Sequence, residues 1–186
     1  MSNLRAQLLD AGIELVADHG LEGLVPCEVD RRAGVTDGTT QECFPTRQAL
    51  VEGVAEHCIE REMQMVAGDR PEVEASPDGV ADALGRFVLR ALDDDRSVTL
   101  SRYVLQAEAA RTPALRAFYA VGADNVDTWA LDLVRRAGSR HPERDFGLLA
   151  NYVTGLVFHE LALPTPDLDP VARVRDVIGA LQWSAP

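Results

Sequence analysis

The sequence predicts an all-α protein of about nine helices. Apolar residues recur every three or four positions in successive stretches of its 186 residues, which is the periodicity of a helix with one buried face. Glycine and proline stand between these stretches, and no stretch alternates apolar and polar residues as a half-buried strand does. We therefore expect three small helices near the N-terminus and six larger ones after them.

The first expected helix covers residues 3–19. Leu8 and Leu15 lie two turns apart on its apolar side. Gly20 ends this helix, because glycine adopts the left-handed backbone of a helix C-cap at little cost. A short connector then leads to Pro26, which suits the first position of the next helix.

Residues 26–47, PCEVDRRAGVTDGTTQECFPTR, are expected to form two short helices joined by a tight turn. Residues 27–33 make the first helix, and Gly34 ends it in a left-handed conformation. Thr36 is expected to cap the second helix, over residues 37–43. Two helices in this arrangement form a helix-turn-helix unit, whose second helix can enter the major groove of DNA.

The run GVTDGTTQECFPTRQALVEGV, beginning at Gly34, resembles the signature of the tetracycline-repressor (TetR) family of bacterial transcription regulators. The upstream run LLDAGIELVADHGLEG resembles the first helix of that family and the turn after it. The resemblance covers about the first third of the chain. It implies a helix-turn-helix DNA-binding domain over residues 1–46 and a helical domain over residues 47–186 that binds a ligand and forms a dimer.

Six larger helices are expected in the remainder of the chain. Their expected ranges are 47–66, 77–92, 97–110, 113–136, 145–163 and the stretch that begins at Pro170. Ser76 and Asp169 each precede a proline, and a short polar N-cap followed by proline is typical of a helix start. The run GDRPEVEASP over residues 68–77 breaks the helical pattern and is the clearest boundary by composition.

Seven polar side chains of the helix-turn-helix region are candidates for contact with an operator of double-stranded DNA. They are Arg31, Arg32, Thr36, Thr39, Thr40, Gln41 and Arg47. Gln41 can read adenine, whereas Asp37 would repel phosphate. Asp30 is expected to be exposed or paired with Arg31 or Arg47.

The charge balance leaves two interpretations of this region open. The chain carries a net charge of -12, and the helix-turn-helix segment is itself net negative. Binding to a nucleic-acid backbone relies on positive surface, so the net charge argues against wholesale coating of DNA but does not exclude one small contact patch. The motif either reads DNA or serves as a scaffold that no longer binds it.

Aromatic and polar residues on the fifth to eighth helices are candidates for the wall of a ligand pocket. They are Phe87, Tyr103, Gln106, Phe118, Asn125, Trp129 and Phe158. Each residue alone is more often part of a core or a surface than of a pocket. Together they fit the ligand-binding domain that the resemblance implies. In that family a small hydrophobic effector bound there shifts the two DNA-binding domains of the dimer.

The last two helices carry long apolar stripes that predict a homodimer. The expected interface residues are Phe146, Val153, Val157, Leu161, Val174, Ile178 and Leu181. The resemblance implies a four-helix bundle made of two helices from each subunit, and hence a palindromic operator. The alternative is that these helices pack only within one chain.

Membrane proteins and enzymes are poorly supported. No apolar run approaches the roughly 20 residues of a membrane span, and the N-terminus lacks the apolar region of a signal peptide, so a cytoplasmic location is expected. His159-Glu160 lacks the second histidine of a zinc-protease motif, because Leu163 stands in its place. We expect no enzyme activity, metal or cofactor, and a repressor released from its operator by a small effector. A helical enzyme with an unrecognised site is the alternative from another class.

Overall fold

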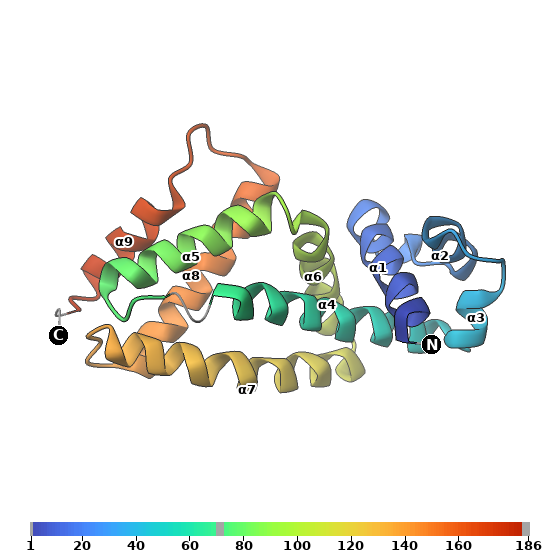
Figure 1. The fold of residues 1–186 in the computed structure, drawn as a ribbon, viewed down its shortest axis with the longest axis horizontal. Helices are drawn as coiled ribbons and strands as arrows, with labels where there is room; N and C mark the ends of the chain where they lie inside the picture. The colour runs from blue at the N-terminus through green and yellow to red at the C-terminus, as the bar shows by residue number, and fades with distance from the viewer. Residues whose placement is uncertain (1, 70–72, 184–186) are drawn as a thin grey trace. The chain divides into compact units, whose positions relative to one another are not determined.

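The computed structural model describes residues 2–69 and 73–183, with side chains described except at 2, 66–69, 114 and 117–127 (Figure 1). Within these residues all regular structure is helical, which confirms the predicted all-α fold. The helices are α1 (Ser2–His19), the short 3-10 helix η1 (Leu21–Gly23), α2 (Pro26–Ala33), α3 (Thr39–Cys43), α4 (Arg47–Asp69), α5 (Pro77–Leu92), α6 (Arg96–Ala109), α7 (Pro113–Arg136), α8 (Pro142–Ala162) and α9 (Pro170–Ala180).

The predicted helix caps at Ser76, Asp169 and Gly34 are present. The Ser76 side chain accepts a hydrogen bond from the N–H of Gly79 at 3.0 Å. The Asp169 side chain accepts one from Ala172 at 2.9 Å. Gly34 ends α2 with φ 67° and ψ 35°, the left-handed conformation that glycine adopts without strain.

Two predicted helix starts are wrong. α3 begins at Thr39 and not at residue 37, because Asp37 and Gly38 form a turn before it. Its N-cap is Gly38, with φ 95° and no side-chain hydrogen bond, so the expected cap by Thr36 is absent. α8 begins at Pro142, three residues before the predicted start, because proline is well accepted at the first helical position.

The chain divides into two compact units, which are described separately. The first unit comprises Met1–Met63 and Ser97–Gly122, and the second comprises Gln64–Arg96 and Ala123–Pro186. The first unit therefore contains the helix-turn-helix region together with the first part of α4, all but the first residue of α6 and the start of α7. The expected functional boundary after residue 46 remains a prediction.

The core of the first unit is built where α1, α4 and α6 meet. Leu8, Leu50 and Leu105 are fully buried there, one from each helix. The hydroxyl of Ser101 on α6 donates to the carbonyl oxygen of Ile13 on α1 at 2.6 Å. These contacts fix α6 against α1, the helix on which α2 of the DNA-binding motif packs.

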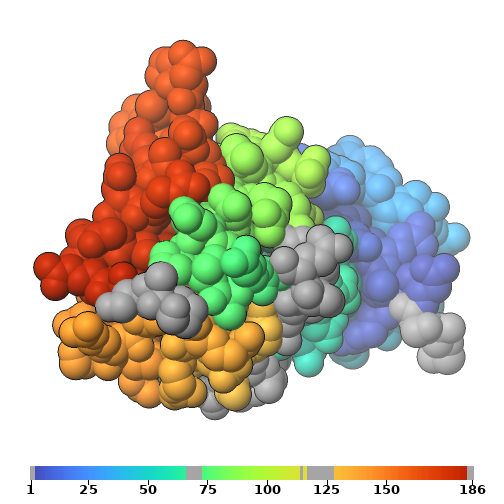
Figure 2. Space-filling model, turned by 60° about the vertical axis from the view of Figure 1, so that its left-hand side comes forward, coloured from blue at the N-terminus to red at the C-terminus, as the bar shows by residue number. Residues whose placement is uncertain are grey.

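The second unit is held together by α5 packing against α9 and α8, and both views show α5 beside α9 (Figures 1 and 2). The contact with α9 is close because Gly85 has no side chain. A Cβ at residue 85 would lie 2.3 Å from Cγ2 of Val171 and 3.0 Å from its Cα and N atoms. The connection between α8 and α9 stands out from this unit in both figures. It is held at its start by Glu160, which accepts the N–H and hydroxyl of Thr165.

Among the described residues, no helix combines the length and the apolar character needed to cross a bilayer.

Replacing Gly85 by alanine should lower the free energy of unfolding by roughly 1–3 kcal/mol, because the new methyl group meets the backbone of Val171 and cannot be relieved by a side-chain rotation. Gly179→Ala in α9 is the matched control. A Cβ there has no neighbour within 4 Å, so alanine should leave stability unchanged or raise it by up to about 1 kcal/mol. Urea unfolding measures both variants, and equal effects would contradict the close contact between α5 and α9.

Candidate functional site

The carboxylate of Asp30 joins the two helices of the helix-turn-helix motif. Asp30 lies on α2 and is only 1% exposed. Its Oδ2 accepts the N–H of Gly38 at 2.8 Å, and its Oδ1 accepts the N–H and the hydroxyl of Thr40 at 2.8 and 2.5 Å. The first N–H groups of a helix have no partner within it, so Asp30 caps α3 from the neighbouring helix. The expectation that Asp30 is exposed or paired with an arginine is therefore wrong.

Burial and hydrogen bonding act in opposite directions on Asp30. Burial raises the pKa of its carboxyl group, since the charged form loses hydration. The hydrogen bonds from the Thr40 hydroxyl and from the N–H groups of Gly38 and Thr40 outweigh this effect and hold the pKa below its ordinary value. Asp30 is therefore ionised at neutral pH, and its negative charge accepts hydrogen bonds inside the motif.

Thr40 has to be removed from the candidate DNA contacts. Its side chain is fully buried, and its hydroxyl donates to Asp30. The hydroxyl of Thr39 is also engaged, because it donates to the carbonyl oxygen of Thr36 at 2.6 Å. Thr36 and Gln41 are exposed. The outward surface at α3 thus presents one amide side chain and few free hydroxyls.

The three candidate arginines all have partners within the chain. Arg31 is ion-paired with Glu28 on the surface of α2. Arg32 forms ion pairs with two acids of α1, Glu14 and Asp18, each at 3.1 Å.

Arg47 holds the connector between α1 and α2. Its Nη1 donates to the carbonyl oxygen of Leu24 at 2.9 Å, and its Nη2 donates to that of Leu21 at 2.7 Å. The expectation that the Arg47 side chain contacts the operator does not match these hydrogen bonds. Both terminal nitrogens are used to fix the backbone that leads into α2.

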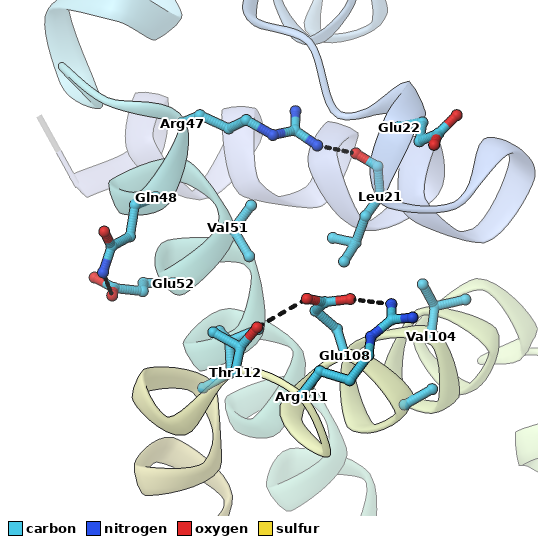
Figure 3. Close-up of a pocket in the computed structure, with 12 residues that line it drawn as sticks. Leu21, Glu22, Arg47, Gln48, Val51, Glu52, Val104, Glu108, Arg111 and Thr112 are labelled. Carbon is cyan, nitrogen blue, oxygen red and sulfur yellow. Dashed lines mark hydrogen bonds and ion pairs between the residues drawn. The ribbon is translucent and has the colours of Figure 1, made fainter.

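A cleft of about 850 Å³ lies within the first unit (Figure 3). One wall comes from η1 and the start of α4, and the other from the end of α6 and the start of α7. The lining residues are Leu21, Glu22, Arg47, Gln48, Val51, Glu52, Val104, Ala107, Glu108, Arg111, Thr112 and Leu115. Of these residues only Arg47 was a predicted site residue, and it was expected to contact DNA. No local pattern marks the rest, because they come from four separate segments.

Of the residues predicted for a ligand pocket, those whose side chains the structure describes do not line this cleft. Tyr103 and Gln106 belong to the first unit, whereas Phe87, Trp129 and Phe158 belong to the second. The side chains of Phe118 and Asn125 lie outside the described residues.

Two of these ligand candidates are poorly placed for a pocket wall. Phe158 is 57% exposed on α8, and Gln106 is exposed and accepts a hydrogen bond from Arg102. The ring of Tyr103 lies under the Arg102 guanidinium group, 4.2 Å from its centre. Phe87 and Trp129 are half-buried and stay candidates.

Four of the predicted dimer residues are buried inside one chain. Val153, Val157, Val174 and Ile178 are at most 5% exposed in the second unit, so they form its own core. Phe146, Leu161 and Leu181 are half-buried. An apolar stripe shows that a helix face is covered, and here the same chain covers it.

The opposite face of α8 is the one that is open. Leu148 and Phe158 are 49% and 57% exposed, and Asn151, Gly155 and Ala162 are exposed between and beyond them at steps of three and four residues. This spacing places all five on one side of the helix. A Cβ at Gly155 would have no neighbour within 4 Å, so another helix can approach closely there.

Replacing Asp30 by alanine should lower the free energy of unfolding by roughly 1–3 kcal/mol at neutral pH, because two N–H groups and a hydroxyl lose their acceptor. The folded pKa lies below the ordinary value of 3.8, so this stabilisation is complete above that value and is lost as the pH falls through the folded pKa. Urea unfolding should show a constant gap between wild type and variant down to about pH 5, and a narrower gap below about pH 4.

Asp37→Ala is the matched control for this prediction, because Asp37 is exposed in the same turn. Its effect on stability should stay within about 0.5 kcal/mol. A gap for Asp30→Ala that is unchanged at low pH would show that the lost side chain acts through packing and not through its charge.

Comparison with known proteins agrees with this architecture. A family model described as "Tetracyclin repressor-like, C-terminal domain" matches residues 75–182. The HTH-type transcriptional regulator CymR of Pseudomonas putida is 30% identical over 182 residues, which cover 92% of this chain and 85% of CymR. A solved transcriptional regulator from Rhodococcus sp. Rha1 has the same fold, with a TM-score of 0.78 at 23% identity over 95% of each chain.

The multidrug binding protein EbrR is also similar in structure. Its complex with imidazole has a TM-score of 0.69 and 26% identity, over 98% of this chain and 96% of that one. Its complex with proflavin has a TM-score of 0.66 at the same identity, over 96% and 99% of the two chains. From its helix-turn-helix motif, its C-terminal family match and its similarity to CymR, this chain belongs to the TetR family of transcriptional regulators.

Proposed function

We propose that the chain is a ligand-responsive repressor that binds a palindromic operator as a homodimer and leaves it when a small hydrophobic effector binds. The observation that supports this most is the cross-helix cap by Asp30. It holds α3 in place while leaving Gln41 of that helix exposed. A buried carboxylate that accepts three hydrogen bonds strongly constrains α3, while the outer face of that helix stays open to a partner.

The contacts with DNA would come mainly from Gln41 and from arginines that change partner. A glutamine amide can donate to and accept from adenine in the major groove. The Arg31 side chain is 75% exposed, and an exposed ion pair contributes only about 0–1 kcal/mol, so Arg31 can leave Glu28 for a phosphate group at little cost. We propose Arg47 as a positioning residue for the connector and not as a phosphate contact.

The dimer would form through the open face of α8. The exposed stripe of Leu148, Gly155 and Phe158 combines apolar side chains with a position where helices can approach closely. A two-fold axis through this contact would give the dimer two copies of α3, the proposed recognition helix, one from each subunit. Two such helices about 34–36 Å apart read half-sites one turn of DNA apart, which makes the operator a palindrome.

The effector is proposed to be a small organic molecule. The similarity to EbrR, which binds imidazole and proflavin, supports this class of ligand. An effector acts by binding one conformation better than the other, and here the favoured conformation is the one whose recognition helices do not match the groove.

A second candidate is a TetR-like sensor that has lost DNA binding. It is favoured by the acids that remain outside the motif. Asp37 and Glu42 are both exposed at α3, where phosphate groups would approach. The net charge of -12 adds a general repulsion at low ionic strength.

A gel shift with the DNA upstream of the chain's own gene, at low salt, tests which candidate holds. The wild type should bind, and Gln41→Ala should weaken binding by roughly tenfold or more, since a good amide–adenine pair contributes about 1–3 kcal/mol. Asp37→Asn should strengthen binding, because it removes a negative charge near the phosphate groups. Glu56→Gln, exposed on α4 outside the motif, is the control and should change little. Absence of any shift would favour the sensor that does not bind DNA.

Light scattering on Phe158→Glu tests the proposed dimer face. A charge in the middle of the apolar stripe should give monomers, because a buried unpaired carboxylate is strongly unfavourable. Leu89→Glu places the same charge on α5 at a leucine that is also 49% exposed, and it should leave the dimer intact. Dimers of both variants would refute the assignment to α8. Val174 and Ile178 are unsuitable for this test, because they are 0% and 3% exposed within the chain and a charge there would unfold it.

A further inference from the structure

The cleft of the first unit has apolar sides and an acidic rim, which consists of Glu22, Glu52 and Glu108. Leu21 and Val51 line one wall, and Val104 and Leu115 line the other. Figure 3 shows the Leu21 and Val51 side chains pointing across the space toward the pair formed by Glu108 and Arg111. The volume of about 850 Å³ lies within the range of small-molecule sites in proteins.

Both arginine side chains that line the cleft, Arg47 and Arg111, already have partners within the chain. Arg111 forms an ion pair with Glu108 at 2.5 Å, and the Thr112 hydroxyl donates to the same carboxylate at 2.8 Å. These hydrogen bonds hold the pKa of Glu108 below its ordinary value, so it is ionised. Arg47 directs both terminal nitrogens to backbone carbonyl oxygens.

Two further carboxylates lack such compensation. Glu52 accepts a hydrogen bond from the neutral amide of Gln48 at 2.8 Å. Glu22 is exposed at the mouth of the cleft. Among the described residues, neither is ion-paired, so three carboxylates face two guanidinium groups and the uncompensated charge of the rim is negative.

We propose that this cleft is an effector site for organic cations with an apolar body. The apolar sides would contact the body of the ligand, and Glu22 and Glu52 would attract its charge. This inference rests on the proposed function, and it names the ligand class and its site. The site is distinct from Phe87, Tyr103, Gln106, Trp129 and Phe158, the predicted pocket residues whose side chains the structure describes.

A ligand in this cleft would act on the DNA-reading motif through the connector. The wall that carries Leu21 and Arg47 is the segment that leads into α2, and Arg47 holds that segment by two hydrogen bonds. The opposite wall belongs to α6 and α7. A molecule in contact with both walls changes the preferred distance between them, and so the position of η1 and α2.

Proflavin, a flat organic cation, is the probe for the test, and fluorescein, a polycyclic aromatic anion, is the comparison. Fluorescence anisotropy with the full-length protein and no DNA should show saturable binding of proflavin that weakens with added salt, and little binding of fluorescein. Because no DNA is present, this result does not depend on whether the gel shift succeeds. Absence of proflavin binding, or equal binding of the two dyes, would overturn the proposal.

Variants of the rim locate the site. The double variant Glu22→Gln, Glu52→Gln should weaken proflavin binding roughly five- to tenfold, as expected for the loss of two exposed ion pairs, while the control Glu56→Gln should leave it unchanged. Ala107→Trp adds a large side chain at an exposed lining residue and should abolish binding without unfolding the protein, as checked by thermal unfolding. Unchanged affinity in these variants would place the dye elsewhere.

Two further measurements test whether proflavin binds in the cleft and not in the second unit, and whether its binding affects the DNA-binding motif. Trp129→Ala, in the second unit, should leave proflavin binding unchanged. Loss of binding in this variant, with Ala107→Trp unaffected, would overturn the assignment. Hydrogen exchange of residues 20–33 should change when proflavin saturates the protein, and unchanged exchange there would refute the coupling to the motif.

Discussion

The recognition helix depends on a carboxylate that belongs to the helix before it. α3 has only five residues, and a helix of that length does not form on its own in water. Its N-cap, Gly38, has no side chain to accept a hydrogen bond. Asp30 supplies the missing acceptor from α2 and receives two N–H groups and the Thr40 hydroxyl. This buried charge therefore helps to fix the orientation of α3, together with the packing of Val35, Cys43 and Phe44 at its ends.

This arrangement changes how the acidity of the motif should be judged. The segment carries four acids, but Asp30 is internal and Glu28 is paired with Arg31. Only Asp37 and Glu42 remain to act on approaching phosphate groups. The charge count of the sequence thus overstates the repulsion, because it gives a structural carboxylate the same weight as exposed ones. A motif that is acidic by composition is compatible with one small DNA contact.

The fold was predictable from local patterns, whereas the site depends on contacts that no local pattern records. The caps at Ser76 and Asp169 involve residues three apart, so the sequence contains all that is needed to expect them. The bond between Asp30 and Thr40 spans a turn and ten positions, and polar residue types alone do not reveal it. Val174 was expected at a dimer contact but is buried within its own chain. Helical periodicity shows that a face is buried, but it does not show which chain covers that face.

Arg47 is the residue through which the proposed effector cleft and the motif meet. It lines the cleft, and it also fixes the carbonyl oxygens of Leu21 and Leu24 just before α2. Coupling between two sites requires an element whose arrangement both sites bias. Here that element is the connector, because η1 forms part of the cleft wall and α2 carries Asp30, which in turn caps α3. A displacement of the connector by a bound cation would reach the recognition helix in two steps, through Arg47 and then Asp30, entirely within the first unit.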